Sequence, residues 1–157
     1  MIISLMKYMK KKSFFCKVLI VYFILNSNLF AEKINFFEQG KKLFEEKNFL
    51  ESKVLFEKDI VFNPLSEKSY LYLAKIFNFD SDDEQTEVNL NNVLLINPKN
   101  DEAIYMMILL KIKQSDYDES KKFIDNFNLV CNSFCSKKDE ISKKFNKIFP
   151  DNEKINN

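Results

Sequence analysis

The stretch Ser115–Ser120, "SDYDES", recurs in outline at two earlier places in the chain. Lys47–Ser52 reads "KNFLES" and Ser81–Thr86 reads "SDDEQT", so the three segments begin 34 residues apart, at 47, 81 and 115. Each segment has an Asn or Asp followed three positions later by Glu or Gln, which is the pattern of a capping box. In that motif the first side chain accepts a hydrogen bond from an unpaired amide of the first helical turn, and the second side chain reaches back. The pairs are Asn48 with Glu51, Asp82 with Gln85, and Asp116 with Glu119.

Two prolines keep the same interval. Asn63-Pro64 and Asn97-Pro98 also lie 34 residues apart, and each follows an apolar run. Proline fixes φ, lacks the amide and disfavours a helical conformation in the residue before it, so each proline ends one helix and opens the next. The unit is therefore helix, turn, helix, turn. These marks predict helices at 33–46, 49–62, 66–79, 83–96, 100–114 and 117–130, with a seventh at 136–149.

The composition favours one all-α globular domain. The chain has 157 residues, of which 46% are hydrophobic and 30% charged, as expected for a chain that buries a core. It contains one Gly and three Pro, too few for the tight turns of a series of β-hairpins. Beyond residue 31 there are nineteen lysines against twenty-three acidic residues, so we expect no nucleic-acid partner.

The first 31 residues read as an export signal. Lys7 and Lys10–Lys12 precede an apolar stretch, and a cleavage point is plausible after Ala31. The uninterrupted apolar run, Val18–Leu25, is shorter than the roughly 20 residues that a helix needs to cross a bilayer. The prediction is a signal peptide at 1–31 and a periplasmic or secreted protein. The alternative is an inner-membrane anchor at 14–30, which would then be the only membrane contact.

At this point the residues resemble the tetratricopeptide repeat (TPR). The first unit supplies Phe36, Gly40, Leu43, Ser52, Phe56 and Pro64, and the second supplies Tyr70, Leu73, Ala74, Phe77, Thr86, Leu90 and Pro98. The third unit has Ile104, Met107, Ser120 and Ile124, but departs from the pattern at Ile108, Lys111 and Asn132. The resemblance implies an α-α superhelix of about three helix pairs, at 33–66, 67–100 and 101–132. An ordinary helical bundle with coincidental spacing is the alternative.

A stack of helix pairs needs a lid at its end, because the last pair cannot cover its own apolar side. The segment 133–157 supplies one, since Ile141, Phe145 and Ile148 recur at helical spacing among lysines. We therefore predict a C-terminal capping helix followed by a polar tail at 151–157.

The resemblance also implies a concave groove, lined by the first helix of each pair, that binds an extended peptide or a partner helix. Aromatic rings beside lysines would suit an apolar segment with an acidic group at its edge. The residues expected there are Phe37, Lys41, Phe44, Leu71, Tyr72, Lys75, Asn78, Glu102, Tyr105, Leu109 and Ile112. The alternative is that some of them, Phe37, Leu71 and Leu109 above all, are buried between helices. The family's carboxylate clamp does not transfer, because Phe37, Tyr72, Glu102 and Met106 occupy its positions.

Cys131 and Cys135 are the remaining candidates for chemistry. In an oxidising compartment, cysteines this close are usually bridged, and a disulfide here would pin the turn before the lid. Free thiols and redox or metal chemistry are the alternatives. A metal would need two further soft ligands, and the chain has no His.

The sequence lacks the usual signs of an enzyme. The absence of His removes the commonest general base, and there is no glycine-rich phosphate loop. We expect no cofactor and no metal. The predicted function is a non-enzymatic adaptor of the bacterial periplasm or cell envelope that binds another protein or peptide. The alternative is a membrane-anchored structural subunit of an envelope complex, joined through its edge.

Overall fold

The computed structural model describes residues 35–150, and these residues are all-α. The described part contains seven α-helices, each ten to fourteen residues long. Their bounds are α2 Phe36–Glu45, α3 Phe49–Phe62, α4 Glu67–Phe79, α5 Asp83–Ile96, α6 Asp101–Lys113, α7 Tyr117–Val130 and α8 Lys138–Ile148. The predicted signal peptide or anchor and the polar tail lie outside the described residues.

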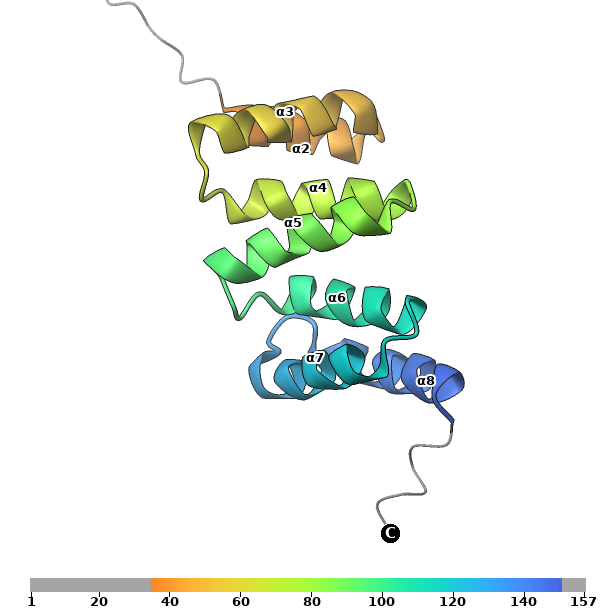
Figure 1. The fold of residues 1–157 in the computed structure, drawn as a ribbon. Helices are drawn as coiled ribbons and strands as arrows, with labels where there is room; N and C mark the ends of the chain where they lie inside the picture. The colour runs from red at the N-terminus through yellow and green to blue at the C-terminus, as the bar shows by residue number, and fades with distance from the viewer. Residues whose placement is uncertain (1–34, 151–157) are drawn as a thin grey trace, which may run out of the picture. The chain divides into compact units, whose positions relative to one another are not determined.

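The helices pack as sequential pairs. The α2, α4 and α6 helices pack against α3, α5 and α7 respectively, and α3 and α5 join each pair to the first helix of the next. The last helix, α8, packs against α6 and α7 at the C-terminal end of the stack (Figure 1). The predicted fold class, helix pairs followed by a capping helix, is confirmed. None of the helices between residues 35 and 150 is long and apolar enough to cross a membrane.

The predicted helix boundaries agree with the structure to within two residues, except at the start of the first helix. That helix begins at Phe36, after the N-cap Asn35, three residues later than predicted, and the lid helix begins two residues later than predicted. A short 3₁₀ helix, Cys135–Lys137, precedes α8, which begins at Lys138.

The turn inside each pair uses a left-handed residue that is not glycine. Lys47, Ser81 and Ser115 have φ of 62°, 61° and 58°, at the same position of each unit. The amide of the following residue donates to a carbonyl of the preceding helix, and these bonds join Asn48 to Leu43 (2.9 Å), Asp82 to Phe77 (2.9 Å) and Asp116 to Lys111 (3.0 Å). This is the C-terminal bonding of a Schellman turn. The prediction that the Glu or Gln side chain reaches back to the amide of the N-cap residue is therefore wrong. That amide already donates its hydrogen bond to a backbone carbonyl of the preceding helix.

The other half of the capping box is mostly confirmed. Asp82 accepts a hydrogen bond from the amide of Gln85 (3.0 Å), and Asp116 accepts one from the amide of Glu119 (3.1 Å). The side chain of Asn48 makes no such bond, so that part of the prediction is wrong. All three residues nevertheless occupy the N-cap, and α3, α5 and α7 begin immediately after them.

The only glycine of the chain, Gly40, makes close packing possible in the first pair. It is buried, and a Cβ added there would lie 3.0 Å from Cε1 of Phe56. Its carbonyl accepts a hydrogen bond from Ser52 Oγ at 2.8 Å. The missing side chain at Gly40 therefore leaves room for the ring of Phe56 rather than for a facing backbone.

The third pair packs although it departs from the repeat pattern. Ile108 is fully buried at a position where the repeat pattern has a small residue, and it packs in one cluster with Ile124 of α7. Lys111, in place of an aromatic residue, is also buried, and its Nζ lies 2.6 Å from Glu87 Oε1 on α5. That hydrogen bond lowers the pKa of the Glu87 carboxyl. The third pair therefore keeps the 34-residue interval with contacts that differ from those of the repeat pattern.

Candidate binding groove

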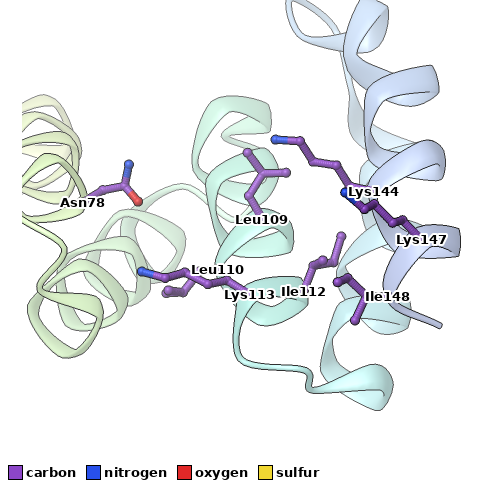
Figure 2. A pocket seen from close by; sticks show the side chains of 8 residues that line it. All are labelled: Asn78, Leu109, Leu110, Ile112, Lys113, Lys144, Lys147 and Ile148. Carbon is purple, nitrogen blue, oxygen red and sulfur yellow. The ribbon is translucent and has the colours of Figure 1, made fainter.

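A groove of about 510 Å³ opens between α6 and α8, with one residue of α4 at its edge. We call it the α6–α8 groove. In Figure 2, Leu110 of α6 lies on the side toward Asn78 and Ile112 on the side toward α8, and lysines project from both α6 and α8. The lining residues are Asn78, Leu109, Leu110, Ile112, Lys113, Lys144, Lys147 and Ile148.

The floor of the α6–α8 groove is apolar. Leu110 and Ile112 are buried parts of the core, and Leu109 is half-buried. Ile148, on α8, stays 47% exposed, although the sequence pattern placed it on the buried side of the lid with Ile141 and Phe145. The prediction is confirmed for Ile141 and Phe145 and wrong for Ile148, because the groove separates the end of α8 from α6.

The rim of the groove is cationic. Lys113 pairs with Asp83 at 2.6 Å, and Lys144 pairs with Glu140 at 3.1 Å. Lys147 takes part in no ion pair among the described residues. No carboxylate lines the groove itself, and among its lysines Lys147 is the one with no competing carboxylate in an ion pair within residues 35–150, so an acidic group that entered the groove would meet this ammonium group first.

The Glu140 carboxylate fixes α8 beside the groove. It accepts hydrogen bonds from Tyr105 Oη at 2.9 Å and from Lys137 Nζ at 3.0 Å, besides pairing with Lys144. These lysines and the tyrosine lower the pKa of the Glu140 carboxyl to about 2. Burial and the bond to Glu140 raise the pKa of Tyr105 to about 12. Tyr105, which was predicted to contact a ligand, is thus hydrogen-bonded to Glu140 of the lid helix.

The aromatic residues predicted to line the groove in the first two pairs pack against one another. The Tyr72 ring lies 5.0 Å from the rings of both Phe56 and Phe44, and 5.7 Å from that of Phe37. Phe37 and Phe44 pack against the buried cluster of Phe56, and burial raises the pKa of Tyr72. These rings therefore belong largely to the core.

The lysines predicted in the first two pairs have intramolecular partners. Lys75 Nζ lies 2.8 Å from Glu102 on α6 and 4.8 Å from the centre of the Tyr72 ring. Lys41 lies 3.9 Å from Glu45, in a largely exposed pair. Leu71 is buried. Of the predicted positions, Asn78, Leu109 and Ile112 thus line the α6–α8 groove. The others pair or pack within the described residues instead.

Sequence reasoning missed the contribution of α8 to the groove. Lys144, Lys147 and Ile148 come from the helix that was predicted only as a lid, and Lys113 was not predicted to line the groove. A signal for them exists. The capping helix follows α7 as each earlier first helix follows a second helix, so its side chains could have been assigned to the groove in the same way.

The chain between α7 and α8 is held by a disulfide and a carboxylate. Cys131 and Cys135 are bridged, with their Cα atoms 5.2 Å apart, as predicted. Asp101 Oδ2 accepts hydrogen bonds from the amides of Asn132 and Phe134, each at 2.8 Å. Burial raises the pKa of the Asp101 carboxyl, but these amides lower it more, so the net shift is downward. The backbone amide of Asn132 therefore makes a hydrogen bond that the proline of the repeat pattern could not make at this position.

Glu67, which lies 34 residues before Asp101, holds the loop between α5 and α6 in the same way. Its Oε1 accepts hydrogen bonds from the side chains of Asn97 (3.0 Å) and Asn100 (2.5 Å). A carboxylate in the first turn of the first helix thus holds the loop that leads to the next unit.

Between residues 35 and 150 there is no group of three or more Cys, Asp or Glu side chains placed to hold a metal ion. Comparison with protein-family models finds none that matches this chain, and a search of curated proteins finds no match. Its fold is an all-helical domain of paired antiparallel helices, consistent with a helical repeat.

Proposed function

We propose that the chain is a TPR-type adaptor, a non-enzymatic module that binds a peptide or a helix of another protein in the α6–α8 groove. The observation that carries this proposal is the combination of an apolar floor with a cationic rim that no carboxylate lines. The 34-residue recurrence of the left-handed turn at Lys47, Ser81 and Ser115 supports the TPR assignment.

The chemistry of the groove favours one type of ligand. An aliphatic or aromatic side chain would be buried against Leu109 and Ile112, which supplies affinity through the removal of apolar surface from water. An Asp, a Glu or a terminal carboxylate beside it would meet Lys147, which has no ion-pair partner in the described part of the chain. The preferred partner is therefore an apolar segment with an acidic neighbour.

A random dodecapeptide phage library, selected on the immobilised chain, tests this proposal. We expect the recovered peptides to carry an apolar residue flanked by Asp or Glu. Lys147→Glu should weaken their binding about tenfold, because one attractive contact becomes repulsive. Lys143→Glu is the matched control, since Lys143 is exposed on the same helix and does not line the groove.

Two results would refute the groove as the binding site. One is the recovery of peptides that bind the Lys147→Glu and Lys143→Glu variants equally well. The other is the absence of enrichment over a selection without the protein. Binding that falls at higher salt, with Leu109→Ala weaker and the exposed Leu129→Ala unchanged, would agree with the proposed chemistry.

We further propose a periplasmic or secreted location. The bridged Cys131–Cys135 pair supports it, because disulfides persist in oxidising compartments. The chain would be released after Ala31, and N-terminal sequencing of the exported protein tests this. A chain that retains residues 14–30 in the membrane would instead favour the second candidate, a membrane-anchored structural subunit.

A further inference from the structure

The N-terminal end of the stack carries an apolar face that no described residue covers. A second groove, of about 430 Å³, lies on it and is lined by Leu43 of α2 and by Leu50, Glu51, Val54 and Leu55 of α3. Leu50 is 73% exposed and Val54 is 42% exposed. We call this surface the end face.

The repeat shows that two positions of this surface are packing positions in the next unit, whereas Val88, at the position of Val54, is 47% exposed there. Phe77 occupies in α4 the position of Leu43 in α2, and the Nζ of Lys53 in the preceding pair lies 5.3 Å from its ring centre. Asn89 occupies in α5 the position of Leu55, and it is only 6% exposed. The first pair has aliphatic residues at the same positions. Within the described residues, no helix pair precedes it.

The charges on α3 indicate what covers the end face. Glu51, Val54, Leu55 and Lys58 follow one another at helical spacing, so they share one side of α3. The acid lies at one end of this stripe and the base at the other, two turns apart, or roughly 10 Å. Neither Glu51 nor Lys58 forms an ion pair within residues 35–150.

We propose that the end face binds the end face of a second copy of this chain, with the two α3 helices antiparallel about a two-fold axis. An axis between Val54 and Leu55 sets each of these residues against the other in the second copy. The same axis sets Glu51 against Lys58 of the second copy, and it does so twice because a two-fold interface is self-complementary.

One further pair obeys the same symmetry. Lys47, exposed in the turn before α3, would lie against Phe62 of the second copy. Phe62 is 75% exposed and is stacked on Phe36 at 5.5 Å. An ammonium group over an exposed ring is attracted to it. The pairing thus accounts for two exposed features of α3 that have no partner within residues 35–150, the aliphatic centre and the separated charges, and it adds a cation to the exposed ring of Phe62.

Sedimentation velocity of the purified full-length chain over a range of concentrations tests the interface. We expect a monomer–dimer equilibrium that Val54→Asp shifts to monomer. Val88→Asp is the matched control, because Val88 occupies the same position one unit later on α5 and is 47% exposed. Circular dichroism should show equal helix content in the two variants, which separates loss of association from loss of folding.

A charge exchange makes the test specific to the proposed geometry. Glu51→Lys and Lys58→Glu should each weaken the dimer about tenfold, and the double variant should restore it. A dimer that Val54→Asp leaves intact, or a double variant no tighter than the single ones, would overturn the proposal. A chain that stays monomeric at its solubility limit would do the same.

Photo-crosslinking from position 54 in a mixture of ¹⁴N- and ¹⁵N-labelled chains identifies the occupant directly. Mixed-isotope products that join α3 to α3 are expected. Products within one chain, joining position 54 to residues 1–34, or products with an unrelated protein, would show that something else covers the end face. This outcome is independent of the peptide selection on the α6–α8 groove, because the two surfaces share no residue.

Discussion

The two ends of the helical stack differ in how far their apolar residues are covered by other helices. At the C-terminal end, α8 places Ile141 and Phe145 against the buried cluster of α6 and α7, and both are at most 9% exposed. At the N-terminal end, Leu50 and Val54 of α3 are open to solvent. Ile141 and Phe145 lie on the side of α8 that faces α6 and α7, whereas no described element packs on Leu50 and Val54, and Val88, at the position of Val54 in α5, is exposed as well.

This comparison shows what a helical repeat requires at its ends. A pair in the middle has both sides covered by neighbours, while an end pair needs a polar cap or a partner. The α8 helix meets the requirement by presenting Lys143, Lys144 and Lys147 to solvent while burying Ile141 and Phe145. The N-terminal pair meets it, in our proposal, with a second copy of the chain.

Removal of the largest buried ring at the C-terminal end should have the greatest effect on stability. Phe127→Ala empties a fully buried site in α7, and we expect a loss of about 3–5 kcal/mol in the free energy of unfolding. Leu129→Ala, in the same helix at an 86% exposed position, should change it by less than about 0.5 kcal/mol. Urea denaturation at one protein concentration measures both, and equal values would contradict the assigned core.

A change in the lid alone measures what the cap contributes. Ile141→Ala removes a buried contact of α8 and should cost about 2–5 kcal/mol. Ile148→Ala, on the same helix but beside the groove, should cost much less because Ile148 is already half-exposed. Amide hydrogen exchange of α8 should report the same order. Similar losses for the two variants would mean that the groove closes over Ile148 in solution.

Loss of the disulfide should loosen the lid without unfolding the core. The joint substitution Cys131→Ser and Cys135→Ser opens a very short loop, so the chain-entropy model gives a loss of about 2 kcal/mol. Faster amide exchange in α8 than in α4 would place the effect at the C-terminal end. Unchanged thermal unfolding would show that Asp101 alone is sufficient to hold the connecting loop.

The smallest effect is expected from acid titration of Glu140. Its folded-state pKa, about 2, lies below the ordinary value of 4.5, so its contribution is present above that value and is lost as the pH falls toward 2. The side chain is about one-third exposed, so the contribution should stay below about 1 kcal/mol. Glu140→Gln should remove this part of the pH dependence, and an NMR titration with a pKa near 4.5 would contradict the assigned contacts.

Local sequence signals predicted most of the helices and the disulfide. Asp82, Asp116 and the two Asn-Pro steps act on neighbouring backbone groups, so their effects can be read without the fold. The same signals could not predict that Lys75 pairs with Glu102 or that Tyr105 binds Glu140. Those partners lie 27 and 35 residues away, on other helices. A side chain with no evident partner in the sequence can thus be ion-paired or hydrogen-bonded in the structure.

The sequence by itself determined an all-helical chain of equal pairs with a lid, because helix starts, stops and apolar spacing are set by contacts within a few residues. Only the tertiary structure decided which lysines remain at the rim of a groove, that α8 forms one wall of it, and that no element within residues 35–150 packs on the outer side of the α2–α3 pair. These features depend on which helices meet and at what distance. Burial and ion pairing are properties of that arrangement, and no single helix contains them.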